Sequence, residues 1–525
     1  CKFQFIFNPS TEIADSISFK QIVMKKFWSL LIIIQMMIFN SCGDESPIIE
    51  LEVQGTEITK FSFLVSDNPG LRSNTYATIE NDVIQGRLSF GVDMKNMVAS
   101  FEHTGAQIMS NNQIQISGKT LNDFSSIQNY QVTTDDGKSG QYEVDMTYFT
   151  GLPIVYIETT NNEEIDSKDD YFTGSISMEG VGYFTDLTSS TMKIRGRGNS
   201  TWGIHPKKPY QLKFSDKTEM LGMPKDKKWI FLAEFSDKSL IRNKIAFEMG
   251  YLSQLDYTPQ SEFAEVVING NYNGIYNISQ KVEESDHRVL IGDTGYLLEI
   301  DQLGRLDADD VYFRTSKFLI NIKEPETEYN SNEFNYVNDL INEFENVLMG
   351  SQFTDPNQGY AKYIDIDSFI DWYLISEITK NQDSRDFSSI FLNVIPGEKI
   401  KMGPLWDFDL AFGNVDYSES EYPTGFWVKH HAWYDRLFQD EVFVEKVKNR
   451  FLYYKENQSF ILEKMDYYAA QLRWSQYEND LKWDLFGRYV WPNPVFFNSH
   501  QAEVDHLKSW YIERMNWLDT AYKGM

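Results

Sequence analysis

The spacing of apolar residues changes near Glu333, and this change constrains the fold class more than any other feature. Before it, short alternating runs such as residues 154–159 (IVYIET) and 296–301 (YLLEID) predict strands. After it, residues 332–348 and 367–380 have the spacing of helices, with one predicted hairpin between residues 388 and 409. We therefore predict an α+β fold in which a strand-rich part precedes a helix-rich part.

The 525 residues leave room for more than one domain. Residues 42–150 contain about seven short strand-like runs separated by turn signals such as Asp67-Asn68-Pro69-Gly70, which predict an immunoglobulin-like β-sandwich. Thr150-Gly151-Leu152-Pro153 marks a boundary. Residues 151–525 then form a second domain with a helical C-terminal part.

The segment 24–42 has the pattern of an export signal. Met24 is followed by Lys25 and Lys26, and the apolar run 27–39 is shorter than the ~20 residues that span a bilayer. This segment resembles a bacterial lipoprotein signal (24–41) with Cys42 as the lipidated residue, which implies export and a lipid anchor in a bacterial membrane, at the outer membrane or cell surface. The alternative is an uncleaved anchor helix. Residues 1–23 precede Met24 and are expected to be an upstream extension outside the fold.

Composition excludes some classes. Lys and Arg total 48 and Asp and Glu total 77, so the formal charge is 48 − 77 = −29, which disfavours general nucleic-acid binding. The two cysteines, Cys1 and Cys42, lie at the N-terminal end, so the rest of the chain contains neither a disulfide framework nor a thiolate zinc site.

One local region is basic within this acidic chain. Between residues 193 and 228 there are ten Lys and Arg and three Asp and Glu, a local charge of about +7. Arg197 lies between Gly196 and Gly198, which allow close backbone approach to a ligand, and Lys213 lies in an alternating strand pattern. Cations and backbone donors together favour a phosphate site. The alternative is a solvated basic hairpin.

A second segment places carboxylates around a predicted hairpin. Asn381 and Asp383 follow a helix, and Asp407 and Asp409 follow the second strand. If the chain is still extended there, the last two side chains face one side and can hold Mg²⁺ or Mn²⁺, while Asp383 can accept a proton from a hydroxyl. The alternative is that all three are turn or cap carboxylates.

Several long motifs follow one another in an order that resembles the CotH-like family of atypical, secreted or surface-associated kinases. They are RGRGNSTW, KKPYQLKF, LGMPKDKKWIFLAEFSDKSLIRN, NGIYNISQKVE, GYLLEID, ITKNQD and GPLWDFDLAFGN. The resemblance implies a divergent, two-lobed protein-kinase-like domain that uses ATP and a divalent metal to phosphorylate Ser or Thr of a protein.

The resemblance also implies roles for single residues. Asp383 matches the catalytic-loop aspartate, and Asp409, with Asp407 close by, matches the metal-binding segment. The nucleotide-binding set is then Lys213 as the strand lysine, Arg197 and Lys208 as helpers, and Lys281, Glu283 and Asn381. Ser388 departs from the kinase pattern, because kinases place a metal-binding Asn five residues after the loop Asp.

Two functions remain open from the sequence. One is a kinase acting on a secreted or surface protein, held at a membrane through Cys42 and binding no nucleic acid. The other is a non-catalytic surface module that binds a glycan or a protein. The kinase hypothesis depends on whether the basic region, and Lys213 in particular, meets Asp383 and Asp409 across one cleft.

Overall fold

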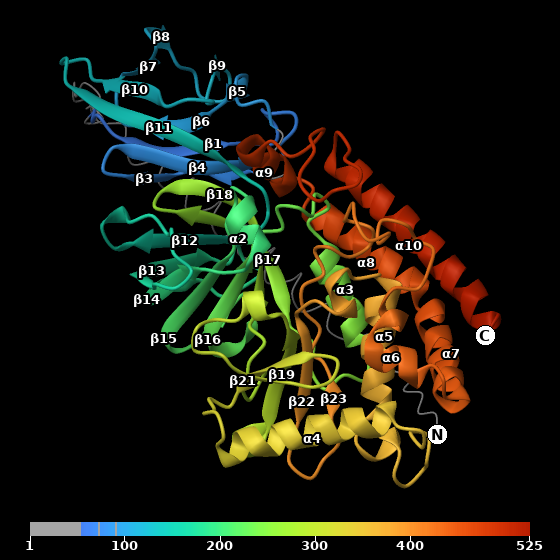
Figure 1. The fold of residues 1–525 in the computed structure, drawn as a ribbon. Helices are drawn as coiled ribbons and strands as arrows, with labels where there is room; N and C mark the ends of the chain where they lie inside the picture. Colours follow the sequence, from blue (N-terminus) through green and yellow to red (C-terminus); the bar gives the residue numbers. More distant parts are fainter. Residues whose placement is uncertain (1–53, 72–73, 90–91) are drawn as a thin grey trace, which may run out of the picture.

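The computed structural model describes residues 54–71, 74–89 and 92–525, so the predicted signal and Cys42 lie outside the described residues. Helices and strands are both abundant, which confirms the predicted α+β class. Three parts follow one another along the chain: a strand-rich N-terminal part, a barrel, and a helix-rich C-terminal part (Figure 1).

We call residues 54–149 the β domain. Its larger sheet has the order β3-β4-β11-β10-β7-β8, and a second sheet has the order β2-β1-β6. Both sheets contribute to one core that includes Phe61, Phe63 and Tyr130. The pairing of β4 with β11 is parallel. The strands are β1 (Ile58–Phe63), β2 (Thr75–Tyr76), β3 (Thr78–Glu80), β4 (Val83–Ser89), β5 (Met97–Val98), β6 (Ser100–His103), β7 (Gln107–Ser110), β8 (Gln113–Ile114), β9 (Leu121–Asn122), β10 (Gln128–Thr133) and β11 (Ser139–Phe149).

The next strands close into a barrel with the order β12-β13-β14-β15-β16-β18-β17. The barrel closes where β17 pairs with β12 in parallel. Alternate residues such as Met192, Ile194, Leu212 and Phe214 fill its interior, as the period-2 pattern predicts. The strands are β12 (Ile154–Thr159), β13 (Phe172–Glu179), β14 (Leu187–Gly196), β15 (Tyr210–Met220), β16 (Met223–Leu232), β17 (Ser261–Ile268) and β18 (Asn271–Gln280).

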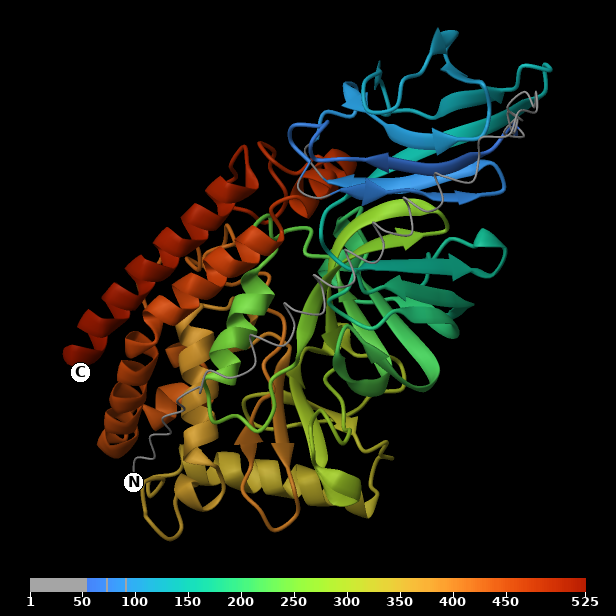
Figure 2. The same ribbon diagram turned by 180° about the vertical axis from the view of Figure 1, so that it is seen from behind.

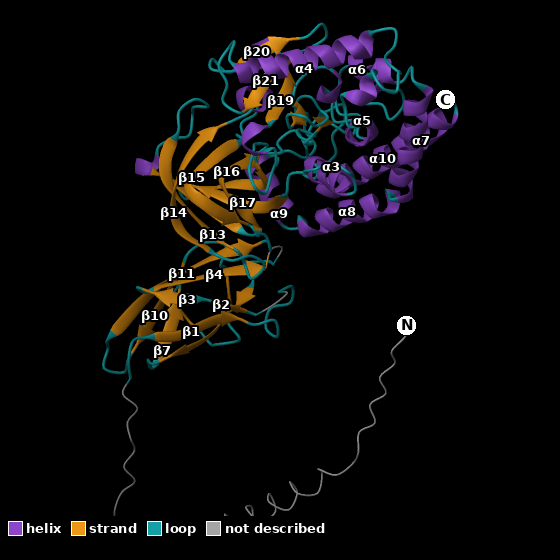
Figure 3. Ribbon diagram, turned by 90° about the horizontal axis from the view of Figure 1, so that it is seen from below, coloured by secondary structure: helices purple, strands orange, loops and turns teal. Residues whose placement is uncertain are grey.

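Beyond the barrel lies a five-stranded sheet with the order β20-β21-β19-β22-β23, with helices beside it and across one end (Figures 1 and 2). Its strands are β19 (Tyr296–Asp301), β20 (Val311–Arg314), β21 (Leu319–Glu324), β22 (Ile390–Val394) and β23 (Lys401–Met402). The helices are α2 (Ser200–Ile204), α3 (Arg242–Tyr251), α4 (Asn332–Met349), α5 (Ile366–Ile378), α6 (Ala432–Leu437), α7 (Glu441–Glu456), α8 (Gln458–Gln471), α9 (Ser475–Trp483) and α10 (His500–Lys523). In Figure 3 the strands of the β domain and barrel separate clearly from the helices of the C-terminal part. None of the helices in the described ranges is long and apolar enough to cross a bilayer.

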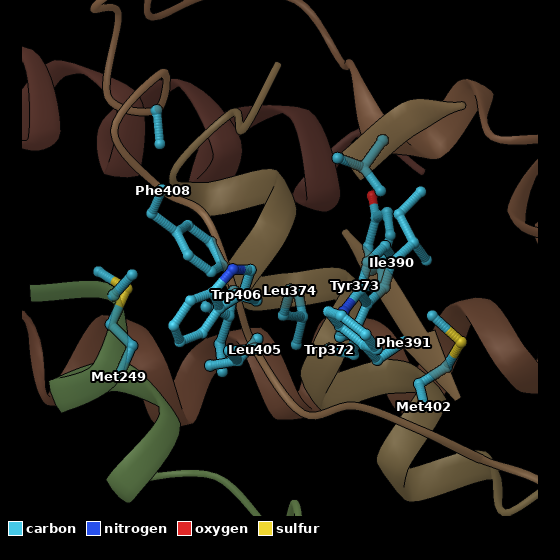
Figure 4. Close-up of a cluster of buried hydrophobic side chains, with 14 of the residues drawn as sticks. Met249, Trp372, Tyr373, Leu374, Ile390, Phe391, Met402, Leu405, Trp406 and Phe408 are labelled. Atoms are coloured by element: carbon cyan, nitrogen blue, oxygen red, sulfur yellow. The ribbon is translucent and has the colours of Figure 1, made fainter. Parts of the chain in front are cut away.

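The largest core lies between α3, α5 and the five-stranded sheet. Trp372, Tyr373 and Leu374 of α5 are buried there, as expected for a helix whose apolar residues surround it on all sides. Leu405, Trp406 and Phe408 continue this core after β23 (Figure 4). The segment that carries Asp407 and Asp409 is therefore anchored by its neighbours.

The structure corrects one detail of the predicted hairpin. We expected the second strand to continue toward Asp407 and Asp409, but β23 ends at Met402. Asp407 has a φ of +66°, in the left-handed region, so the two aspartates are not on an extended strand. Their placement depends on the surrounding structure instead of on strand alternation.

Candidate active site

Asp383 lies at the start of the short 3₁₀ helix Asp383–Arg385, just after α5. Its side chain is nearly buried, and a guanidinium nitrogen of Arg305 lies 3.8 Å from one carboxylate oxygen. Burial, followed by the charge of Asp407, raises the pKa of Asp383 to about 7, while Arg305 lowers it. Asp383 and Asp407 are therefore neighbours, and Asp383 has a pKa suited to proton transfer near neutral pH.

Asp409 belongs to the same group. Desolvation, followed by the charges of Asp407, Glu234 and Asp383, raises its pKa well above the ordinary value. Within the described ranges no donor is hydrogen-bonded to the carboxylate oxygens of Asp409, whereas Asp407 accepts from the Ser389 hydroxyl at 3.4 Å. The predicted catalytic and metal-binding aspartates thus lie together with little compensating positive charge.

Arg197 is the residue of the basic region that reaches this group. Its guanidinium lies 5.4 Å from the centre of the Trp406 ring. Burial lowers the pKa of Arg197, and the nearby charges of Asp407 and Asp409 oppose that shift. Since Arg197 directly follows β14, the barrel supplies a cation to carboxylates that the C-terminal part holds.

One of the two glycines beside Arg197, Gly196, does not leave the space for a ligand that we expected. A Cβ at Gly196 would clash with the Trp202 ring, so the space there is filled by a side chain of the same protein and not left for a ligand. Gly198 has a φ of +82°, which favours glycine.

Lys213 lies outside the carboxylate group. It is exposed on the outer face of β15, opposite Lys193 on β14 and Lys228 on β16. Arg195 lies two residues from Lys193 and therefore shares this face. These cations form a row along the outside of the barrel that begins next to Arg197. In the described part of the chain no ion pair or hydrogen bond joins Lys213 to Asp383, Asp407 or Asp409.

The other predicted nucleotide-binding residues have local partners. Lys208 donates to the carbonyl of Trp202 at 2.6 Å. Lys281 and Lys228 both pair with Glu283, at 3.3 and 2.9 Å, and burial lowers the pKa of Lys281. These contacts place Lys281 and Glu283 together, but they do not connect them to the aspartates.

Asn381 and Ser388 are also engaged within the protein. The Asn381 amide donates to the carbonyl of Asp407 at 3.0 Å and its oxygen accepts from the backbone N–H of Asp383 at 3.3 Å. Asn381 thus links the two acidic segments. Arg305 donates to the Ser388 hydroxyl, so the position that departs from the kinase pattern is bonded to the same arginine that meets Asp383. In kinases a helix glutamate pairs with the strand lysine, whereas Glu248 of α3 pairs with Lys464 at 3.2 Å and not with Lys213.

Sequence reasoning missed several residues of the site. Glu234 is buried, and burial, followed by Asp237, raises its pKa to about 8, while Asn243, Asn277 and Lys207 oppose the rise. Glu299 and Tyr417 also lie close enough to the site to interact with its charges. The charge of Glu299 raises the pKa of Arg197, and the charge of Asp383 raises the pKa of Tyr417. Glu299 lies in a strand pattern, and none of the three carries a local signal that distinguishes it from an ordinary polar residue.

The donor set fits a hard divalent cation. Carboxylate oxygens are the ligands that Mg²⁺ and Mn²⁺ prefer, and Mg²⁺ commonly uses one or two carboxylates, several waters and substrate phosphates. Within the described ranges no three His, Cys, Asp or Glu side chains are already placed to hold a metal together. A site of two carboxylates completed by water and phosphate agrees with both observations.

The sequence model described as CotH kinase protein matches residues 194–518, more than half of the chain. The chain belongs to the CotH kinase protein family. The CotH match contains Arg197, Asp383, Asp407 and Asp409, and it begins inside the barrel.

A curated relative is the inner spore coat protein H of Bacillus subtilis (strain 168), which is 28% identical over 200 residues. That alignment covers 36% of this CotH chain and 50% of the relative, so the chain spans about half the length of the curated relative it matches.

Two solved structures also match. One is a protein of Bacteroides fragilis NCTC 9343 described as a candidate secreted protein, with 15% identity and a TM-score of 0.13, covering 18% of this chain and 95% of that chain. The other is described as a candidate glycoside hydrolase of Bacteroides thetaiotaomicron, with 14% identity and a TM-score of 0.16, covering 56% and 88%. Both scores are too low to support an argument about the site.

Proposed function

We propose that this CotH protein is an ATP- and metal-dependent kinase that phosphorylates Ser or Thr of a secreted or surface protein. The convergence of Arg197 with Asp383, Asp407 and Asp409 carries the proposal. These carboxylates repel one another, so a bound divalent cation would compensate them far better than the two nearby arginines do.

Each residue has a distinct part in the proposal. Asp407 and Asp409 would hold Mg²⁺ or Mn²⁺, and Arg197 would bind a phosphate of ATP. The bound nucleotide would supply the phosphoryl group. Asp383 would orient an acceptor hydroxyl and take its proton, which suits a carboxylate whose pKa lies near 7.

The proposed phosphate-binding and metal-binding residues come from two different parts of the molecule. The barrel contributes Arg197, and the helix-rich part contributes the aspartates. We propose that these parts correspond to the two lobes that the family resemblance implies, and that the row of Lys193, Arg195, Lys213 and Lys228 adds positive potential beside the phosphate site.

The purified chain should be stabilised by ATP with Mn²⁺, by about 2.7 kcal/mol when the ligand is present at ~100 times its Kd. Asp409→Asn should abolish this stabilisation, because it removes a metal ligand. Thermal unfolding with and without Mn²⁺–ATP measures the effect. Asp339→Asn, on an exposed side chain of α4, is a matched control and should behave like the wild type.

Transfer of label from γ-labelled ATP to protein tests catalysis. Asp383→Asn should lower the rate by roughly 10²-fold or more while leaving nucleotide stabilisation in place. Unchanged labelling in that variant would show that Asp383 is not the base. If the wild type neither binds nucleotide nor transfers label, the non-catalytic surface module becomes the better hypothesis.

We further propose that the protein is exported and anchored to a membrane through a lipid on Cys42. The support is the sequence of residues 24–42. Cells that express the chain and are fed a radiolabelled fatty acid should label the wild type, and Cys42→Ser should lose the label. Equal labelling of both would contradict the anchor.

A further inference from the structure

Three asparagine side chains bind backbone groups of the segment that carries the proposed metal ligands. Asn381 donates to the carbonyl of Asp407 at 3.0 Å, Asn243 accepts from the N–H of Phe408 at 2.7 Å, and Asn414 donates to the carbonyl of Asp409 at 2.8 Å. All three asparagines are buried. Asn243 of α3 and Asn381, which follows α5, join this segment to other parts of the chain, whereas the contact of Asn414 is local.

The segment needs such support because of its backbone conformation. Asp407 has a φ of +66°, which non-glycine residues adopt only when the surrounding structure favours it. The three bonds hold the peptide groups that follow Asp407 and Asp409, and so fix the direction in which these two side chains leave the backbone.

Asn243 is itself oriented by a buried carboxylate. Its amide nitrogen lies 3.2 and 3.1 Å from the two oxygens of Glu234. The backbone N–H of Phe408 can only donate, so the amide oxygen of Asn243 faces Phe408 and the amide nitrogen faces the two Glu234 oxygens. Asn277 on β18 donates to Glu234 at 3.2 Å and holds it in place.

We infer that Glu234 and Asn243 are positioning residues that pre-organise Asp407 and Asp409 for metal binding. The inference rests on the proposed function for the metal, but the hydrogen-bond chain exists independently of it. Glu234 acts here through Asn243, because its oxygens are engaged by the amides of Asn243 and Asn277.

A donor–acceptor exchange tests this chain of bonds. Asn243→Asp sets a second carboxyl group against Glu234 and removes the amide that donates to it. Adding Glu234→Gln restores a bond of reversed direction, because the new amide donates to the carboxylate introduced at position 243, which can still accept from the N–H of Phe408. This swap keeps the size of the two side chains and keeps one amide and one carboxyl group in the pair.

Binding of Mn²⁺ to the purified full chain, followed by electron paramagnetic resonance, gives the first readout. Asn243→Asp should raise the Kd for Mn²⁺ by about 10-fold or more, as is typical when a residue that orients a metal ligand is lost. The double variant should return to within about threefold of the wild type. If Asn243→Asp binds Mn²⁺ as the wild type does, or if the folded double variant stays as weak as the single one, the inference is wrong.

Hydrogen exchange at the Phe408 amide gives a second readout that needs neither metal nor activity. It should be slow in the wild type, at least tenfold faster in Asn243→Asp, and slow again in the double variant. Failure of the wild type to bind Mn²⁺ would overturn the proposed function, whereas unchanged exchange in Asn243→Asp would overturn this inference.

Asn321→Asp is the matched control. Asn321 is a buried asparagine on β21 that donates to Asp310 at 2.9 Å, so the substitution also sets two carboxylates together. It should leave exchange at Phe408 unchanged. Faster exchange there in both variants would mean that general destabilisation explains the result, and would overturn the positioning role.

Discussion

At the scale of single residues, the site combines neighbouring carboxylates with few compensating contacts. Asp383 has only a 3.8 Å ion pair with Arg305 among the side-chain contacts of the described residues, and burial raises its pKa to about 7. Keeping such a group costs stability whenever it is ionised. The arrangement is easier to explain by function than by folding.

This cost predicts a stabilising substitution. The pKa of Asp383 is about 7 in the folded chain against 3.8 for the ordinary group, so its contribution to stability is complete below pH 4 and is lost as pH rises through 7. Asp383→Asn should therefore raise the free energy of unfolding at pH 8 by roughly 1–3 kcal/mol, with a smaller gain at pH 5. Urea unfolding at the two pH values measures this. A destabilised variant at pH 8 would contradict the reasoning.

At the scale of elements, α5 and α10 fix the start of the loop that carries Asp383. Arg514 of α10 pairs with Glu377 at the end of α5 at 2.5 Å, and both side chains are fully buried. Arg514 also donates to the carbonyls of Pro423 and Gly425, while Glu377 accepts from the N–H groups of Trp427 and Lys429. The last helix thus supports the loop that carries Asp383, in addition to completing the core.

Removing one partner of this pair should be costly. Arg514→Ala leaves Glu377 buried without its counter-charge and should lower the free energy of unfolding by about 3–5 kcal/mol. Denaturant unfolding measures the loss. Lys523→Ala on the same helix is the control, because Lys523 is largely exposed and its pair with Asp519 should be worth less than ~0.5 kcal/mol. Similar losses in the two variants would show that Arg514 is not a central contact.

At the scale of the whole molecule, one arginine of the β domain lies close to two glutamates, one in the barrel and one in the helix-rich part. Arg87 of β4 lies near Glu265 of β17 and Glu478 of α9, and it lowers the pKa of both carboxyls. Burial still dominates, and raises the pKa of Glu265 to about 8 and that of Glu478 to about 7. Figure 1 shows α9 beside the β domain, so these residues lie where three parts of the molecule meet.

The contact between these parts should weaken in alkaline solution. Because folding raises the pKa of Glu265, its stabilising contribution is present at low pH and is lost as pH rises through 8. Glu265→Gln removes this pH dependence. Between pH 6 and pH 9 the free energy of unfolding of the variant should therefore rise by roughly 2 kcal/mol relative to that of the wild type. Thermal unfolding of both proteins across this range measures the difference. A constant difference between them would contradict the raised pKa.

The sequence by itself determined the local elements. Alternating and helical spacing located β12, β19, α4 and α5, and the order of motifs identified the family. The same motifs predicted a site at three aspartates, which the fold brings close together. These features were predictable because hydrophobic periodicity and motif spacing are properties of neighbouring residues.

Only the tertiary structure decided which residues meet. The sequence placed Lys213 in a clear strand pattern, but the strand register leaves its side chain on an exposed face. Arg197, just past the end of β14, lies near the aspartates instead. The bonds from Glu234 through Asn243 to Phe408 join residues 174 positions apart in sequence (408 − 234), and no local pattern specifies them. Contacts between buried polar groups depend on the packing of whole elements, which is why a single sequence gives the acidic residues of the site but not the contacts that organise them.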